Sequence, residues 1–157
     1  MVTKTTKEIE AAFKAQGWNY NIDEHPNGNT SALITGFDLK SGRSIQIFFI
    51  SANAERGEDL AIRVFEFMAV PAGKEAAALR ACNEANNEFR FAKFALLNNG
   101  NIAIEMDMPA ETQNVGAVAV ELLYRLLDIA DNAYPIFEKA LSGGPAPTFS
   151  PNNSERY

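Results

Sequence analysis

The sequence predicts an α+β domain: an antiparallel sheet with helices packed mainly on one face, in the order α-β-β-β-β-α-β-β-α. Runs rich in β-branched and aromatic residues are joined by short turns of the hairpin type, which favours antiparallel pairing. Runs with apolar residues at helical spacing come before, between and after these strands, so the helices gather on one side of the sheet. A chain of 157 residues without an internal repeat is the size of one domain.

The first helix is predicted over residues 6–16. Thr5 and Glu8 have the spacing of a capping box, in which each side chain bonds a backbone N–H at the helix start. Apolar residues then recur at helical intervals until Gly17, which can adopt the left-handed conformation that ends a helix.

Two further helices are predicted over residues 74–87 and 115–141. The first of these is rich in alanine, and the second carries a broad apolar stripe. We expect the domain to span residues 1–141. The tail over residues 142–157 is rich in Pro, Gly, Ser and Asn, a composition that predicts disorder.

Four strands are predicted before the second helix, and a hairpin over residues 89–108 follows it. The four runs are WNYNID (18–23), TSALITGF (30–37), RSIQIFFIS (43–51) and LAIRVFEFMAV (60–70). The breaks between them, HPNGN, DLKSG and NAERGED, have the composition of turns.

The register of the hairpin follows from its loop. Asn98, Asn99 and Gly100 predict a type I turn with a G1 bulge, because only Gly100 accepts the left-handed conformation without cost. This register puts the apolar residues of both strands on one side: Phe94 opposite Ile104, Leu96 opposite Ile102, and Ala92 opposite Met106. Lys93 and Glu105 become cross-strand partners on the other side. Glu105 and Asp107 are then ordinary acids of a polar face, and no catalytic pair is assigned.

The sequence lacks the residues that common catalytic and metal sites require. His25 is the single histidine and Cys82 the single cysteine, so we expect no histidine-rich zinc site, thiolate cluster or internal disulfide. Cys82 on an alanine-rich helix is interpreted as a small core residue. No nucleophile elbow or phosphate-binding loop occurs. We therefore predict a protein that is not an enzyme and that needs no cofactor or metal.

The charge pattern and hydropathy restrict the partners. The net charge is −6 and the basic residues are scattered singly, so nucleic acid is not an expected partner. No apolar run reaches the length of a membrane span, and the first residues lack a secretory signal. We expect a soluble, cytoplasmic protein that does not bind membranes.

Strand alternation leaves apolar residues on the second face of the sheet. Phe48 and Ile50 lie opposite to Ile45, Ile47 and Phe49 in their strand. Phe65 and Phe67 likewise lie opposite to Ile62 and Val64 in the next strand. Helices on one face do not explain this surplus, so a partner is expected to cover it, most simply a second copy. The alternative is a bulge near Val64 that would return two of these residues to the core.

A second hypothesis is a small-molecule sensor with a pocket between the sheet and the helices. Phe65, Phe67, Met68 and Met106 would line that pocket, and Arg63 would be its polar anchor. An enzyme is the third and weakest hypothesis.

Residues 74–141 resemble the YbjN-like proteins, bacterial domains also described as putative sensory transduction regulators. The resemblance lies in Asn83 and Asn86 before an Arg-Phe-x-Lys-Phe strand, in Gly100, and in Tyr134 followed by proline in the last helix. It implies a fold similar to the small chaperones of type III secretion, which dimerise and hold extended segments of client proteins. It implies no catalytic residues. The role of Asn86 is interpreted as side-chain bonding to backbone at the helix end.

These observations predict a protein-binding module with a chaperone-like or regulatory role. We expect a homodimer that contacts a protein or peptide client.

Overall fold

The computed structural model describes residues 1–55 and 57–142 of the chain, which form three helices and six strands. In chain order these are α1 (Lys4–Gln16), β1 (Asn21–Glu24), β2 (Thr30–Asp38), β3 (Ser44–Ala54), β4 (Gly57–Ala69), α2 (Glu75–Glu88), β5 (Lys93–Leu96), β6 (Asn101–Met108) and α3 (Val115–Leu141). The predicted order of elements is confirmed. The prediction of disorder for residues 142–157 concerns, apart from Ser142, residues outside those described.

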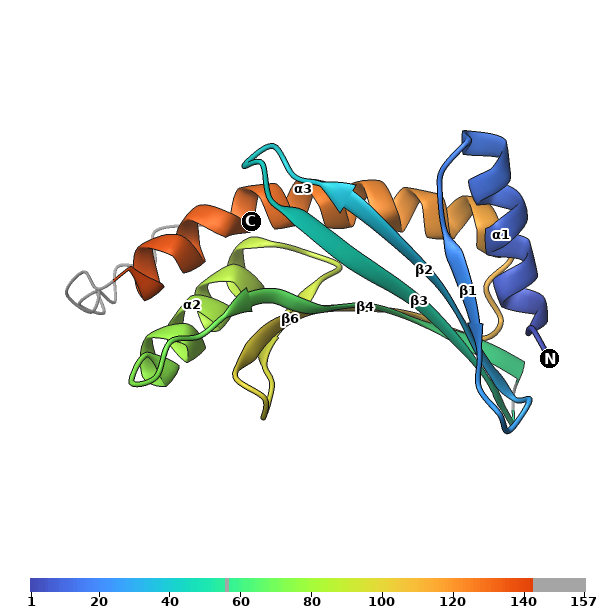
Figure 1. The fold of residues 1–157 in the computed structure, drawn as a ribbon, viewed down its shortest axis with the longest axis horizontal. Helices are drawn as coiled ribbons and strands as arrows, with labels where there is room; N and C mark the ends of the chain where they lie inside the picture. The colour runs from blue at the N-terminus through green and yellow to red at the C-terminus, as the bar shows by residue number, and fades with distance from the viewer. Residues whose placement is uncertain (56, 143–157) are drawn as a thin grey trace.

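The strands form one sheet in the order β1-β2-β3-β4-β6-β5, with every neighbouring pair antiparallel. The long helix α3 runs along one side of the sheet, with α1 near its first turns and α2 near its far end (Figure 1). This confirms the α+β class with helices mainly on one face. The resemblance to secretion chaperones in fold stays a prediction.

The start of α1 differs from the prediction. Thr3, not Thr5, is the N-cap residue, and its hydroxyl accepts a hydrogen bond from the backbone N–H of Thr6 at 3.2 Å. Ser31 of β2 accepts the N–H of Thr3 at 3.0 Å. The helix therefore begins at the point where Ser31 of the sheet can accept a hydrogen bond from the residue that caps it. Its end is as predicted, because Gly17 adopts φ 70°.

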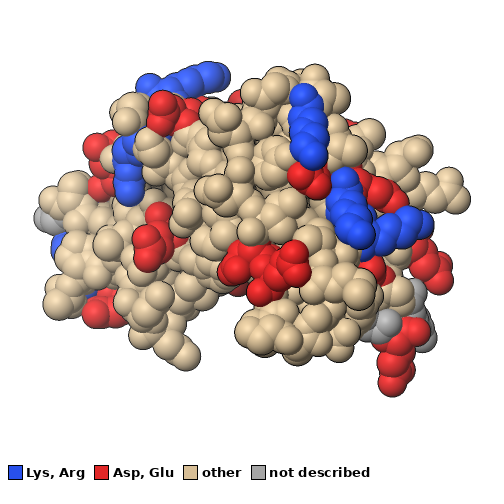
Figure 2. Space-filling view, turned by 45° about the vertical axis from the view of Figure 1, so that its right-hand side comes forward, with Lys and Arg blue, Asp and Glu red and all other residues tan. Residues whose placement is uncertain are grey.

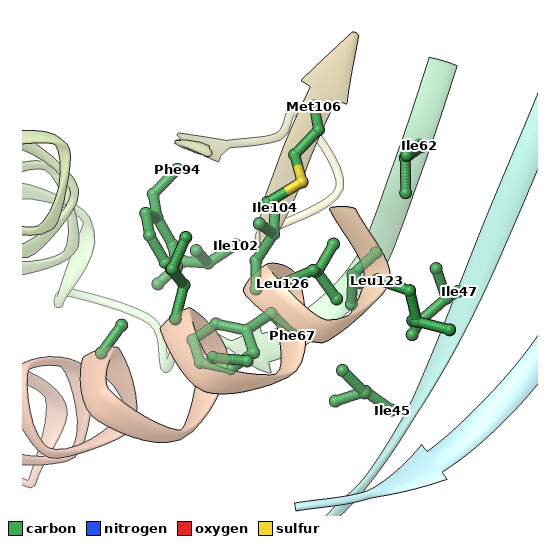
Figure 3. Packing of buried hydrophobic residues seen from close by; sticks show 14 of the residues in the cluster. Ile45, Ile47, Ile62, Phe67, Phe94, Ile102, Ile104, Met106, Leu123 and Leu126 are labelled. Carbon is green, nitrogen blue, oxygen red and sulfur yellow. The ribbon is translucent and has the colours of Figure 1, made fainter. Parts of the chain in front are cut away.

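The core lies between the sheet and the helices. Side chains from β3, β4 and β6 point toward α3, where Leu123 and Leu126 are fully buried among them (Figure 3). The two helices α1 and α3 approach closely at Gly116, where an added Cβ would lie 2.7 Å from the carbonyl oxygen of Glu8. Glycine at this position allows both helices to reach the sheet.

The hairpin of β5 and β6 has the predicted register. Lys93 pairs with Glu105, Phe94 with Ile104 and Leu96 with Ile102. The backbone N–H of Gly100 donates to the Leu97 carbonyl at 3.0 Å, and Gly100 has φ 83°. The first strand is shorter than predicted. It begins at Lys93 because Phe91 takes a left-handed conformation, with φ 72°, between α2 and the strand.

An irregularity in β4 corrects one prediction. Val64 pairs with Ile104 and Met68 with Ile102, so three residues of β4 stand opposite Ala103 alone. The extra residues rotate Phe67 into the core, where it is 1% exposed, while Phe65 keeps the opposite direction and is 37% exposed. The assignment of Phe67 to the second face is therefore wrong. The bulge considered as the alternative is present, and it returns one of the four residues to the core.

Candidate functional site

The sheet face opposite the helices carries an apolar centre. Hydrophobic residues of β2, β3 and β4 on this face remain half-buried or exposed, whereas their neighbours on the other face are buried. We call this surface the open face, and the apolar residues at its centre are Ala32, Ile34, Phe48, Ile50, Ala61 and Phe65. Phe48, Ile50 and Phe65 were expected here. Ala32, Ile34 and Ala61 were missed, because the runs TSALITGF and LAIRVFEFMAV carry apolar residues on both faces of their strands, so alternation does not single these three out.

Two aromatic rings dominate the open face. Phe48 of β3 and Phe65 of β4 pack edge to face, with their ring centroids 5.2 Å apart. On the same strands, Phe49 and Phe67 point the other way and are completely or almost completely buried. Aromatic pairs of this geometry contribute to binding when a partner desolvates them.

Arg63 lies beside the aromatic pair, but its guanidinium group already has partners. Its Nη1 donates to the backbone carbonyl of Met106 at 2.7 Å, and its Nη2 donates to Oδ1 of Asp107 at 2.6 Å. Lys93 and Glu105 form the neighbouring ion pair, with Nζ and Oε2 2.7 Å apart. Glu105 and Asp107 thus each form an ion pair with a basic side chain.

The pocket proposed for the second hypothesis is not formed by the residues predicted for it. Met68 and Met106 lie in the core, 8% and 2% exposed. Arg63 lies on the opposite face of the sheet, paired with Phe48 and Glu105. A strand turns successive side chains to opposite faces, so these residues cannot line one cavity.

Hollows on the open face lie beside acidic residues. One hollow of about 450 Å³ is lined by Asp23, Ile34, Phe48 and other residues of β1, β2 and β3. A second, of about 330 Å³, lies between Phe48, Phe65 and Glu66. These hollows are shallow depressions around the apolar centre, which a protruding side chain of a partner could fill.

Cys82 is a buried side chain of α2 with no sign of activation. Burial raises its pKa to about 11, so the thiol stays protonated at neutral pH.

Among residues 1–55 and 57–142, no three His, Cys, Asp or Glu side chains are grouped as a metal site would require. Within the same ranges, no helix has both the length and the apolar character of a membrane span.

Charged side chains are interspersed over the surface. On the side shown in Figure 2, the Lys and Arg side chains lie in small groups, separated by acidic groups and uncharged surface, and do not merge into one patch.

The interpretation of Asn86 as a structural residue agrees with its contacts. Its amide nitrogen donates to the carbonyl of Phe94 at 3.1 Å, and its amide oxygen accepts the N–H of Phe94 at 2.7 Å.

Comparison with known proteins gives one result on the family. No curated protein matches this chain. The model of the YbjN family, described as "Putative bacterial sensory transduction regulator", matches residues 5–134 and so covers both the sheet and most of α3. The chain therefore belongs to the YbjN family.

Proposed function

We propose that this chain is a non-enzymatic regulatory module that works by protein–protein contact through the open face. The observation that carries the proposal is the apolar centre around Phe48 and Phe65, which none of the three described helices covers. The family description as a sensory transduction regulator supports a regulatory role. A second copy of the chain is the first partner we propose, which would make the resting form a cytoplasmic homodimer.

Burial of the open face supplies enough free energy for a specific contact. Apolar surface contributes roughly 25 cal/mol per Å² when it leaves water, so a few aromatic and branched side chains contribute several kcal/mol. Lost translational and rotational freedom offsets part of this. A dimer of moderate affinity is the expected result.

The solution mass over a range of protein concentrations tests the proposal. We expect a mass that rises toward the dimer with concentration. Phe48→Asp should hold the protein at the monomer mass with unchanged helix content, because a carboxylate at the centre of the contact must be desolvated. Leu79→Asp is the matched control, since Leu79 is 56% exposed on α2, away from the open face. A wild-type monomer at every concentration, or a Phe48→Asp dimer, would contradict self-association through this face.

One observation favours a second candidate, a small-molecule sensor on the open face. The hollow beside Ile34, Phe48 and Ile50 has about 450 Å³, which lies within the range of ligand sites. A ligand bound there would raise the melting temperature by mass action. A metabolite panel that shifts the wild type but not Ile50→Asp would support this candidate, whereas equal shifts in both would reject it.

A further inference from the structure

Carboxylates stand at both ends of one row of residues that crosses the open face. Asp23 of β1 pairs with Ala32, which pairs with Ile50 of β3. Ile50 pairs in turn with Ala61 of β4, and Ala61 with Asp107 of β6. The row therefore reads acid, alanine, isoleucine, alanine, acid. Neighbouring strands lie about 4.8 Å apart, so four intervals separate the two acids by roughly 19 Å.

A third carboxylate borders the aromatic pair. Glu66 is exposed and lines the hollow that also contains Phe48 and Phe65. We call Asp23, Glu66 and Asp107 the acidic rim. Asp23 and Glu66 make no ion pair within the part of the chain that the structure describes.

The basic groups beside the apolar centre neutralise only part of the rim, because Arg63 pairs with Asp107, whereas Asp23 and Glu66 make no ion pair among the described residues. Arg63 has a side chain only 18% exposed, and it bonds the carbonyls of Ile62 and Met106 as well as Asp107. The side chain of Asp107 nevertheless remains 69% exposed. Lys93 is held by Glu105, and His25 lines the hollow next to Asp23. A partner that approaches the open face therefore meets mainly negative charge around an apolar centre.

This charge opposes a second copy and favours a basic partner. Two copies that meet through their open faces bring two acidic rims together, so their contact weakens at low salt, where like charges are least screened. A partner with lysine or arginine at the edge of its apolar residues replaces that repulsion by attraction. A basic partner can therefore readily displace the second copy.

We infer that the open face binds a protein segment that carries basic residues on both sides of a short apolar centre, and that this segment displaces the second copy. The inference rests on the proposed function, because it uses the same face. An extended segment advances about 3.3 Å per residue. The two basic positions therefore lie about six residues apart, with about five residues between them, to match the separation of Asp23 and Asp107.

Three labelled synthetic peptides test the inference. All have the same apolar centre of about five residues in extended alternation, which is the length set by the strand geometry. The first has lysine at both ends, the second has glutamate at both ends, and the third has the lysines together at one end. Fluorescence anisotropy gives the affinity at several salt concentrations, and light scattering gives the mass of the protein with and without peptide.

The first peptide should bind about tenfold more tightly than the other two, and its affinity should fall as salt rises. It should also convert dimer to monomer, whereas salt alone should strengthen the dimer. Asp23→Asn should reduce the preference for the first peptide, and Glu84→Gln, on an exposed position of α2, should leave it unchanged. Phe48→Asp should abolish binding of all three.

The outcomes separate this inference from the proposed function. If the protein dimerises but binds all three peptides equally, or binds none, the basic partner is rejected and self-association through the open face stands. If the protein neither dimerises nor binds any peptide, the inference and the proposed function both fail.

Discussion

The two faces of the sheet use similar side chains for different purposes. Phe49 and Phe48 are adjacent in β3, yet Phe49 is fully buried against Phe13 of α1, whereas Phe48 is half-buried on the open face with its ring against that of Phe65. The covered face is completed by helices of the same chain. The open face has comparable apolar residues but a border of carboxylates. Hydrophobicity alone therefore does not assign a strand residue to the core, because a helix must also be available to cover it.

Alanine substitution of the adjacent pair in β3 gives the largest expected contrast. Phe49→Ala should reduce the free energy of unfolding by about 3 to 5 kcal/mol, because it leaves a cavity in a closed core. Phe48→Ala should cost about 1 kcal/mol in the monomer, since its ring is half-buried. Urea unfolding at low protein concentration measures both. Equal losses would mean that the open face is as well packed as the covered one.

Substitution of Gly116 tests how closely the helices must approach the covered face. The Cβ of Gly116→Ala would lie 2.7 Å from the backbone oxygen of Glu8 and 3.1 Å from Cβ of Ala12, so α1 and α3 must separate. We expect a loss of about 1 to 3 kcal/mol, from which the better helix propensity of alanine subtracts up to about 1 kcal/mol. Gly36→Ala is the control, because its nearest contact is an ordinary 3.7 Å. Thermal unfolding of both variants shows whether the loss of stability comes from the crowding at Gly116 or from the loss of a glycine as such.

Removal of the hydrogen bonds that attach the edge strand β5 to α2 should have a smaller effect on stability. Asn86→Ala removes both hydrogen bonds to the backbone of Phe94, so β5 loses its only partner on that side among the bonds of the described residues. We expect a cost of about 1 to 2 kcal/mol and faster hydrogen exchange at the Phe94 amide. Asn83→Ala, whose side chain makes no hydrogen bond in the described ranges, should change neither quantity. Unaltered exchange in Asn86→Ala would show that the strand does not depend on this amide.

The smallest expected effect concerns the attachment of α1 to the covered face. Burial raises the pKa of Glu58, but backbone N–H groups of Thr5 and Lys4 donate to its carboxylate at 2.6 and 3.1 Å and outweigh burial, so its pKa lies below the ordinary 4.5. A depressed folded-state pKa means that the contribution to stability is present above the unfolded value and is lost as the pH falls through the folded value. Glu58→Gln should therefore flatten the acid limb of a plot of stability against pH. A variant with the wild-type acid limb would contradict this role.

Local sequence predicted those features that neighbouring residues decide. Gly100 and the two asparagines before it gave the register of the hairpin, and with it the ion pair of Lys93 and Glu105. Gly17 gave the end of α1. The surplus of apolar residues on the second face was visible from strand alternation for Phe48 and Phe65. In each case the property depends on residues within a few positions of one another.

Other features depended on contacts between distant segments. The cap of α1 moved to Thr3 because Ser31 bonds it, and Glu58 accepts N–H groups of the first turn. The sequence did not reveal these partners. The sequence predicted Arg63 as a free polar anchor for a ligand. In the folded protein its guanidinium group already bonds Asp107 and the Met106 carbonyl.

The order of the elements, the pairing of the last hairpin and the presence of an apolar second face followed from the sequence, because periodicity and turn chemistry are local. Tertiary structure decided which aromatic residues remain on that face. Three residues of β4 opposite Ala103 turn Phe67 toward α3 and leave Phe65 beside Phe48. It also brought Asp23 and Asp107 to the two ends of one row, since strand order sets the distance between residues that are far apart in the chain.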